Sequence, residues 1–178
     1  QNIDLMPTFL DMHNHSIPTE VKGKSLLNYL DKDAENKFTA LYGYWGGGIN
    51  ITDGKFSYFH YPENFSQQNP DRYQYTLMPT HMRQFFSNEE LQTATLHKPF
   101  DFTKDIPLLK INRIERKTDG GYKGFEDTKS ALYNLQNDPG QLTPLADEKK
   151  SNEYQQMMID IINEYDPPKE LIKNYFEN

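Results

Sequence analysis

The sequence predicts an α+β fold, in which a small antiparallel sheet is packed by a C-terminal helix. Residues 40–62 read as two strands joined by the turn Thr52-Asp53-Gly54-Lys55, because Asp-Gly accepts the positive φ of tight hairpins. Residues 154–165 carry apolar side chains at helical spacing. Further strand-like segments lie at 73–78, 106–114 and 131–135. Strands joined by turns and followed by a helix give the predicted class.

The composition indicates one polar domain that is rich in aromatic rings. The 178 residues are 35% hydrophobic with a mean hydropathy of -0.88, and the 13% aromatic share offsets this polarity. The formal net charge of -7 argues against nucleic acid or an anionic membrane as the main partner. No apolar run approaches the length of a membrane span. Because the chain has no cysteine, it has no disulfide, thiolate nucleophile or thiolate metal ligand.

The N-terminal segment predicts a helix with a mostly apolar face. Pro7 fits only in the first turn, and Asn14 stands where a left-handed residue can end the helix. The apolar face consists of Ile3, Leu5, Met6, Phe9, Leu10 and Met12. Residues 23–25, Gly-Lys-Ser, lead into a short apolar turn at 26–30. A phosphate-binding loop would need glycine at the position of Pro18, which favours a plain loop and helix start.

The middle of the chain alternates loops with short elements. Loops are expected at 31–37, 63–72 and 100–104, with tight turns at 119–121 and 137–140. Ser87 stands before Asn88-Glu89-Glu90-Leu91 and predicts the cap of a short helix.

The C-terminal segment predicts an amphipathic helix followed by a second, shorter one. The face of the first consists of Tyr154, Met157, Met158, Ile161, Ile162 and Tyr165. Ser151 or Asn152 is the expected cap, and Pro167-Pro168 ends the helix. The second helix turns Leu171, Ile172, Tyr175 and Phe176 inward. This stripe of rings and methionines predicts a core face and not a cofactor site.

No complete catalytic set is visible in the residues themselves. The sequence contains no nucleophile elbow, zinc-protease motif, Walker loop or dinucleotide fingerprint. His13 and His15 have a spacing that could bind metal on a strand, but here they follow a helix with only Asp11 nearby. We therefore predict no metal site.

Three side chains are candidate substrate contacts. Trp45, the single tryptophan, adjoins Gly46-Gly47-Gly48, where glycine allows a ligand to approach the backbone. His81 and Arg83 follow a strand end, where binding residues often lie. The alternatives are a core anchor for Trp45 and a hydrogen-bonded structural histidine for His81.

The N-terminal segment also resembles a segment of sulfatases. Residues 3–12, IDLMPTFLDM, are similar to the helix (I/V)DLxPTLLDLxG of that family, with Asn14 at the position of its glycine. Ile17-Pro18 and then GKSLL at 23–27 resemble the xxxP and GxSLxxL that follow. Asparagine keeps a left-handed helix end accessible at position 14.

Two later segments resemble the same family in the same order. TDGKFSY at 52–58 is similar to a strand pair that often reads TDG(R/K)YxY. ALYNLQNDPGQ at 131–141, with Leu145-Ala146-Asp147, resembles the LYDLxxDPxExxNLA stretch before the last helix. Together the segments span nearly the whole chain and indicate the C-terminal part of a sulfatase of the alkaline phosphatase superfamily.

The resemblance implies a reaction whose machinery lies outside this chain. Such enzymes hydrolyse sulfate esters with a formylglycine made from a C/S-x-P-S-R motif and with a divalent ion, usually calcium. Those motifs precede the first helix seen here and none is present, so we assign no catalytic or metal residue and expect no cofactor in this chain itself. We read the chain as part of a longer protein, with a processed mature N-terminus as the alternative.

The resemblance also implies two parts and a role for each. Residues 1–37 would be a helical remnant of the α/β catalytic domain, and 38–178 the C-terminal subdomain of sheet and helix that forms one wall of the cleft. Trp45, His81 and Arg83 would then contact substrate, with Arg83 meeting a second anionic group on a sulfated sugar.

Three hypotheses follow. In the first, the chain is a sulfatase part that is inactive alone. Its partners are the missing catalytic domain and a sulfated small molecule or glycan, and the apolar N-terminal helix could form a homodimer. In the second, it is a stand-alone carbohydrate-binding or protein-interaction module. In the third, it is an enzyme that uses His81 with a carboxylate.

Overall fold

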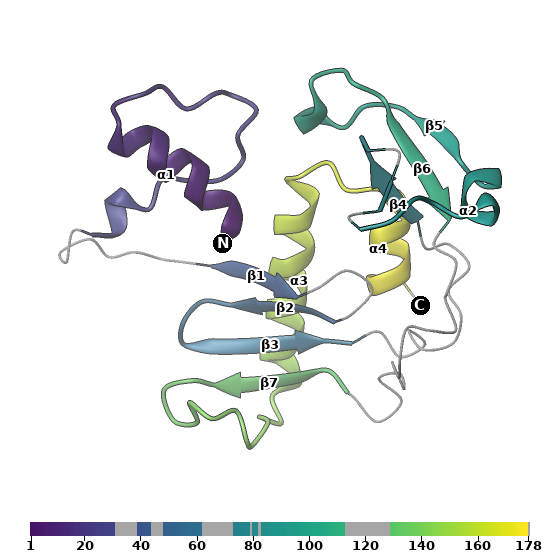
Figure 1. The fold of residues 1–178 in the computed structure, drawn as a ribbon. Coiled ribbons are helices and arrows are strands. Elements are labelled where there is room, and N and C mark those ends of the chain that lie inside the picture. The colour runs from purple at the N-terminus through teal and green to yellow at the C-terminus, as the bar shows by residue number, and fades with distance from the viewer. Residues whose placement is uncertain are drawn as a thin grey trace. The chain divides into compact units, whose positions relative to one another are not determined.

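The computed structural model describes residues 1–30, 39–43, 48–61, 73–78, 80–81, 83–112 and 129–177. The chain forms two units, Gln1–Glu63 with Thr128–Tyr165 and Asn64–Asp127 with Asp166–Asn178 (Figure 1). Antiparallel sheets and helices confirm the α+β class. The predicted domain boundary at residue 37 lies within the sequence range of the first unit and stays a prediction. The predicted loops at 31–37 and 63–72 and the turn at 119–121 lie outside the described residues.

The first unit contains a four-stranded antiparallel sheet in the order β1-β2-β3-β7. Its strands are β1 (Ala40–Gly43), β2 (Ile49–Thr52), β3 (Phe56–His60) and β7 (Ala131–Asn134). The stretch 40–62 thus forms three strands and not the predicted two, because the chain reverses where Gly43 pairs with Ile49. Gly43 has φ 146°, and a Cβ on it would lie 2.5 Å from the carbonyl oxygen of Gly48. Glycine is what permits this reversal.

The predicted Asp-Gly turn between β2 and β3 is confirmed. Gly54 has φ 82°, and Asp53 Oδ1 accepts hydrogen bonds of 2.8 Å from the backbone N–H groups of Lys55 and Phe56. Asp53 Oδ2 accepts from the hydroxyl of Tyr154 at 2.8 Å. Burial alone would raise the pKa of Asp53, but these hydrogen bonds hold it below its usual value. The carboxylate therefore fixes the turn and ties it to Tyr154 in the helix Glu148–Asn163.

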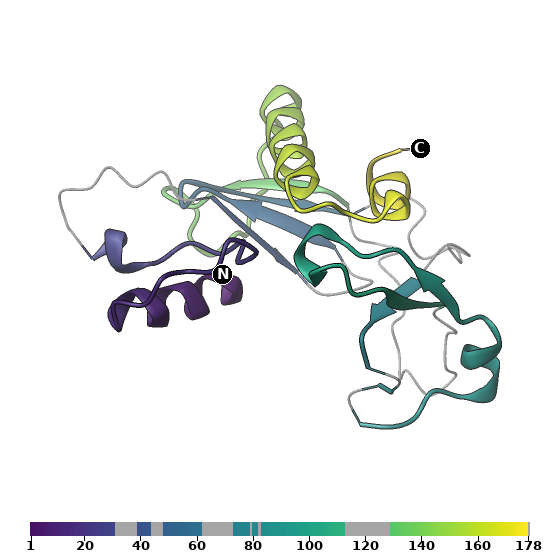
Figure 2. The ribbon, with the colours of Figure 1, turned by 90° about the horizontal axis from the view of Figure 1, so that it is seen from above.

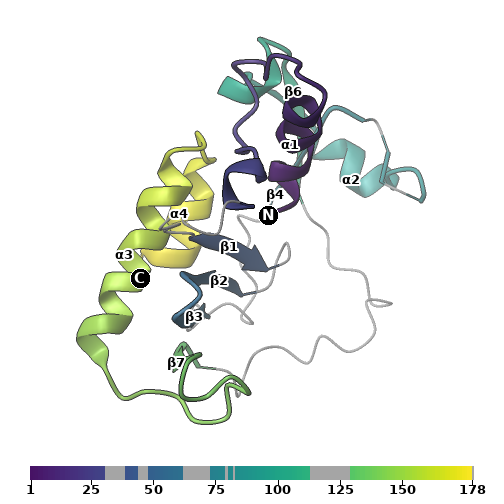
Figure 3. The ribbon, with the colours of Figure 1, turned by 90° about the vertical axis from the view of Figure 1, so that its left-hand side faces the viewer.

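Helix α3 (Glu148–Asn163) packs on β2 and β3 and forms the core of the first unit. Figures 2 and 3 show it along one face of the sheet. The predicted inward face is confirmed at its centre, where Tyr154, Met158 and Ile162 are buried, whereas Met157 is 36% exposed. The core of the first unit also contains three buried residues of the sheet, Ile51, Tyr58 and Leu132.

The predicted cap of this helix was wrong by about one turn. Helix α3 begins at Glu148, where Asp147 Oδ1 accepts from the backbone N–H of Lys150 at 3.0 Å. Ser151, one of the two expected caps, lies inside the helix, and its hydroxyl donates to the carbonyl oxygen of Asp147 at 2.9 Å. The apolar stripe begins only at Tyr154, so the polar first turn gave no periodic signal.

Replacing Tyr154 with Phe should lower the free energy of unfolding by about 1 kcal/mol, because the hydrogen bond to Asp53 is lost while the ring is kept. Its ring contact with Phe56, with centroids 6.0 Å apart, should persist. Urea denaturation measures the change. Tyr133→Phe is the control, since no hydrogen bond joins the Tyr133 hydroxyl to a described residue. Equal losses in both variants would contradict the role of the Asp53 contact.

The N-terminal segment forms η1 (Asn2–Asp4) and α1 (Leu5–Met12), as predicted. The helix ends at the predicted left-handed residue, since Asn14 has φ 55°. The N–H of His15 bonds to the carbonyl of Leu10 at 2.8 Å, and that of Asn14 to Asp11 at 3.0 Å. These two bonds form a Schellman motif, which satisfies the last carbonyls of the helix.

The loop at 18–30 binds back onto η1 and α1 through their side chains. The backbone N–H of Lys24 donates to Asp4 Oδ1 at 2.8 Å, and that of Leu26 donates to Thr8 Oγ1 at 2.9 Å. Ser25 Oγ donates to Asp11 Oδ2 at 2.5 Å. A Cβ on Gly23 would lie 1.9 Å from the carbonyl oxygen of Ile3. The Gly-Lys-Ser segment therefore serves a structural loop, which ends in η2 (Leu27–Tyr29).

Several apolar side chains of the N-terminal segment are exposed. The exposed fraction lies between 46% and 58% for Ile3, Leu5, Met6, Phe9 and Met12. In contrast, Pro7 and Asp4 are buried. The apolar face predicted from the sequence is present, but in this chain it meets solvent.

The second unit contains a three-stranded antiparallel sheet in the order β4-β6-β5. Its strands are β4 (Tyr73–Thr76), β5 (Thr95–His97) and β6 (Leu108–Asn112). The strands predicted at 73–78 and 106–114 therefore pair with each other in a second sheet, and β5 was not predicted. Three residues are too few to show a period-2 pattern.

Helices complete the second unit. Helix α2 (Asn88–Gln92) precedes β5, and η3 (Asp101–Thr103) lies in the predicted aromatic loop, where the rings of Phe100 and Phe102 stack at 5.4 Å. Helix α4 (Lys169–Phe176) is the predicted second C-terminal helix, and its Glu170 bonds to the hydroxyl of Tyr75 and to Lys110 Nζ at 2.6 Å. Burial and the bond to Glu170 raise the pKa of Tyr75 to about 12. No helix in the described ranges has the length and hydropathy needed to cross a bilayer.

Candidate functional site

The candidate site lies in the second unit, in the segment that leads into α2. An antiparallel bridge between Thr80 and Phe85 closes this segment, and His81 follows Thr80 directly. Ser87 caps α2 as predicted, since its Oγ accepts from the N–H of Glu90 at 3.2 Å. In return, the N–H of Ser87 donates to Glu90 Oε2 at 2.7 Å. This reciprocal capping box fixes the carboxyl group of Glu90 at the start of the helix.

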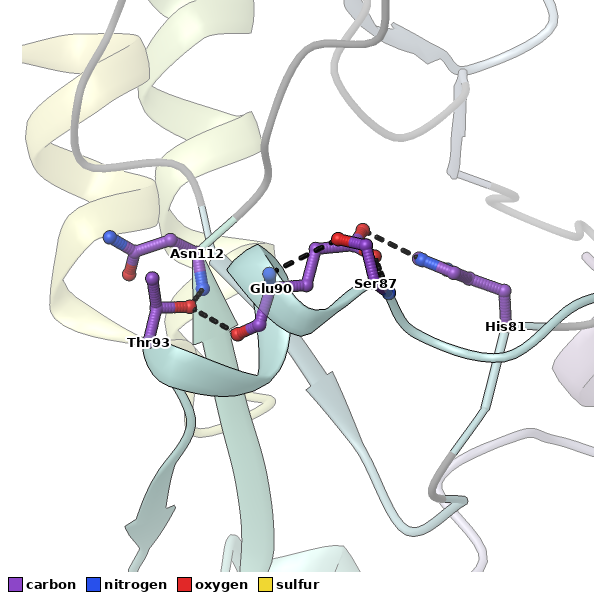
Figure 4. Close-up of polar contacts among 5 residues, drawn as sticks. All are labelled: His81, Ser87, Glu90, Thr93 and Asn112. Carbon is purple, nitrogen blue, oxygen red and sulfur yellow. Dashed lines mark hydrogen bonds and ion pairs between the residues drawn. The ribbon is translucent and has the colours of Figure 1, made fainter.

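The structure pairs His81 with this carboxyl group. His81 Nε2 lies 2.8 Å from Glu90 Oε1, so His81 and Ser87 meet different oxygens of one carboxylate (Figure 4). Glu90 is buried, with 4% of its surface exposed. Burial alone would raise its pKa, but the bonds from Ser87 and His81 outweigh burial and hold the pKa below its usual value. The carboxylate is therefore charged at neutral pH.

Two further contacts hold the geometry of the pair. The ring of Phe86 packs against that of His81 with centroids 4.4 Å apart. At the other end of α2, Thr93 Oγ1 donates to the carbonyl of Glu90 at 2.7 Å and accepts from the N–H of Asn112 at 3.0 Å. Figure 4 shows this second connection, which ties α2 to β6. His81 is thus held by a helix that is itself fixed to the sheet.

The remaining ring nitrogen of His81 is the atom that can meet a ligand. Because a carboxylate only accepts, Nε2 carries the hydrogen shared with Glu90. Nδ1 then accepts in the neutral ring and donates in the imidazolium. The His81 side chain is 24% exposed, and no described residue bonds to its Nδ1.

Arg83 is exposed and forms no hydrogen bond or ion pair with another described residue. It lies two residues from His81 in the same segment, so this segment presents a guanidinium and an imidazole. Trp45, the third predicted contact, lies outside the described residues together with Gly46 and Gly47. The structure therefore describes two of the three candidates, which lie two residues apart in the sequence.

Sequence reasoning missed Glu90 as the partner of His81. The Ser87-x-x-Glu90 spacing is a recognisable capping box, which marks the glutamate as the start of a helix. Glu90 also bonds to His81, nine residues earlier in the chain, and no periodic pattern in the sequence predicts that contact. The structure supplies the carboxylate that the third hypothesis required for His81.

This pair lacks the other parts of a hydrolase within the described residues. The Ser87 hydroxyl caps α2, and the structure shows no described nucleophile bonded to His81. Formylglycine and calcium, which the resemblance implies for a whole sulfatase, do not fit this chain. The sequence has no cysteine and no Ser-x-Pro-Ser-Arg, and the described ranges hold no group of three or more metal-ligating side chains.

What the segment can do is bind an anion. The exposed arginine, and the fixed histidine when it is an imidazolium, can each donate to sulfate or carboxylate oxygens. No model of a known protein family matches the chain, and a search of curated proteins finds no matching sequence.

Proposed function

We propose that this chain is the non-catalytic C-terminal part of a sulfatase, the enzyme class that hydrolyses sulfate esters. In this proposal another part of the protein supplies the nucleophile and the calcium ion. The chain forms one wall of the substrate cleft, and Trp45, His81 and Arg83 contact the group that carries the sulfate.

The observation that carries the proposal is the contact between α1 and the loop at 18–30. The segment at 3–12 bonds to the Gly-Lys-Ser-Leu segment at 23–26 through three polar side chains, those of Asp4, Thr8 and Asp11. Gly23 is required there because a Cβ would overlap a backbone oxygen. The residues that match the family pattern are therefore the ones that hold this loop on the helix. This agreement supports a common origin over chance similarity.

The exposed apolar side chains of the N-terminal segment also support the proposal. Five large apolar residues, Ile3, Leu5, Met6, Phe9 and Met12, are about half exposed on a short segment. Exposed apolar patches commonly mark surfaces that pack against another domain. The α/β catalytic domain is the partner that the resemblance implies for this segment.

His81 and Arg83 are proposed to bind an anionic group of the substrate. The bond to Glu90 orients His81, and Arg83 presents a planar donor group that suits sulfate. In the longer protein, Arg83→Ala should raise the KM for a sulfated sugar about 10-fold with little change in kcat. Lys98→Ala removes an exposed cation of the same unit and serves as the control.

Two measurements test the proposed function. The coding sequence upstream of Gln1 should contain a C/S-x-P-S-R motif. The longer protein should hydrolyse 4-nitrophenyl sulfate in the presence of calcium, whereas residues 1–178 alone should not. An upstream sequence without the motif, or turnover by residues 1–178 alone, would overturn the proposal.

A stand-alone carbohydrate-binding module is the second candidate, favoured by the half-exposed rings on the first sheet. Such a module would bind glycans whether or not a catalytic domain is attached. A glycan array on residues 1–178, with and without Trp45→Ala, tests this function. Binding by residues 1–178 combined with an upstream sequence that lacks the sulfatase motif would favour the module.

A further inference from the structure

One face of the first sheet is turned away from α3. Phe56 of β3 contacts Tyr154 of α3, and side chains alternate along a strand, so Ser57 and Phe59 point to the opposite face. Residues paired with them across the sheet share that face. We call this surface the tyrosine face and define it by Tyr42, Asn50, Ser57, Phe59, Ala131 and Tyr133.

The tyrosine face presents a row of aromatic rings. Tyr42 stands edge-on to Phe59, with centroids 6.1 Å apart and an interplanar angle of 85°. Phe59 stands edge-on to Tyr133 at 5.6 Å and 89°. Tyr42 is 41% exposed, and the other two rings are half-buried. The row thus combines packed rings with accessible aromatic surface.

Tyr61 extends this row at the end of β3. Its ring lies on the backbone of Gly48, where a Cβ would be only 2.6 Å from the ring. Burial raises the pKa of Tyr61, and the neighbouring hydroxyls of Tyr42 and Tyr133 raise it further. Tyr61 therefore lies near Tyr42 and Tyr133, and Gly48 of the triple glycine makes room for its ring.

A buried amide lies within the same face. Asn50 pairs with Tyr42 and Phe59 across the sheet and is 8% exposed. Its Oδ1 is buried without a hydrogen-bond partner among the described residues. The hydroxyl of Tyr42, beside it, shares a hydrogen bond of 2.7 Å with Ser57 Oγ. A buried acceptor without a donor is costly, so a ligand hydroxyl that reached it would be favoured.

The strand positions on this face carry no charged residue. The chain as a whole has a net charge of -7, which disfavours an anionic ligand away from Arg83 and His81. Rings with a few placed hydroxyl and amide groups suit a ligand that has an apolar face and hydroxyl edges. A sugar ring without charged substituents has this chemistry.

We propose that the tyrosine face binds an uncharged sugar ring. The inference rests on the proposed function for the identity of the glycan, because the sugar would be a neutral unit of the same sulfated chain. The ring stacks on Tyr42 or Tyr133, and its hydroxyls bond to the tyrosine hydroxyls and the Asn50 amide.

The test is an NMR titration of the ¹⁵N-labelled chain of residues 1–178 with uncharged hexasaccharides of glucose, mannose, galactose and xylose. We expect at least one of them to bind with a Kd of about 1 mM and to shift the amide signals of Tyr42, Asn50 and Ala131. Tyr42→Ala and Tyr133→Ala should each weaken binding about 10-fold. Tyr42→Phe keeps the ring and the fold and should have a smaller effect. Tyr29→Ala is the matched control, because Tyr29 is 37% exposed and lies outside the sheet.

Three results would overturn the inference. The first is the absence of shifts with every hexasaccharide. The second is shifts that centre on His81 and Arg83 instead, which would leave the proposed function standing. The third is shifts on the tyrosine face that depend on protein concentration alone, which would assign the face to a second copy of the chain. The upstream motif and sulfate hydrolysis test the proposed function separately, so the two can fail independently.

Discussion

Replacing Glu90 with Gln is expected to lower the free energy of unfolding by about 2 kcal/mol at pH 7. The carboxylate is buried and accepts hydrogen bonds from Ser87 N–H and from His81, and a neutral amide replaces only part of these. Urea denaturation at several pH values measures the loss. Glu89→Gln is the matched control, because Glu89 is an exposed neighbour in the first turn of the same helix. Its change should stay within about 0.5 kcal/mol.

The pH dependence of this effect has a definite sign. The folded state holds the pKa of Glu90 below its ordinary value of 4.5, so the carboxylate contributes its full stability above that pH. The contribution is lost as the pH falls through the lower pKa of the folded state. The gap between wild type and Glu90→Gln should therefore shrink as the pH falls below 4.5. A gap that stays constant with pH would show that the ionised carboxylate is not what stabilises α2.

The loss of Glu90 should also affect the proposed anion binding. Glu90 acts as a positioning residue, because it contacts His81 and not the substrate. In Glu90→Gln the imidazole loses the carboxylate that accepts from its Nε2, so the ring is held less firmly in place. Binding of a sulfated sugar should then weaken in Glu90→Gln, whereas Glu89→Gln, which leaves the contact with His81 intact, should bind as wild type does.

Replacing Gly23 with Ala is expected to release the loop at 18–30 from α1 at a cost of about 3 kcal/mol. The added methyl group would overlap the carbonyl oxygen of Ile3, which belongs to the backbone and cannot rotate away. Hydrogen exchange measures the result directly. The amides of Lys24 and Leu26 should lose protection, since their acceptors on Asp4 and Thr8 would move out of reach.

The matched control for this substitution is Gly140→Ala. A Cβ on Gly140 would approach side-chain atoms of Leu142 and Asp138, the nearest at 3.4 Å, so that variant should stay within about 1 kcal/mol of wild type. Protection of Lys24 and Leu26 in Gly23→Ala that equals wild type would contradict the close approach. It would also remove the main support for the resemblance, because the glycine would no longer be required.

The features that could be predicted from the sequence are those set by neighbours along the chain. The Asp53-Gly54 turn, the left-handed Asn14 and the Ser87 cap depend on residues within a few positions of one another. The inward face of α3 follows from side chains repeated at helical spacing. These local preferences agree with the final structure, so propensity and pattern alone identify them.

Pairing between distant segments decided the candidate sites. The sequence placed His81 and Arg83 after a strand but contained no sign that Glu90 would hold the histidine. The tyrosine face likewise joins residues of β1, β2, β3 and β7, which the sequence separates by up to about ninety positions. Strand pairing creates such surfaces, and the residue pattern within one segment does not predict which strands pair.

By itself, the sequence determined the α+β class, the Asp53-Gly54 turn, the left-handed Asn14, the cap of α2 and the inward stripe of α3. Only the tertiary structure decided that residues 40–62 form three strands and that β4, β5 and β6 make a second sheet. The physical reason is the range of the interactions. Turns and caps are hydrogen bonds between near neighbours, whereas sheet order and the His81–Glu90 pair depend on which distant segments meet when the chain folds.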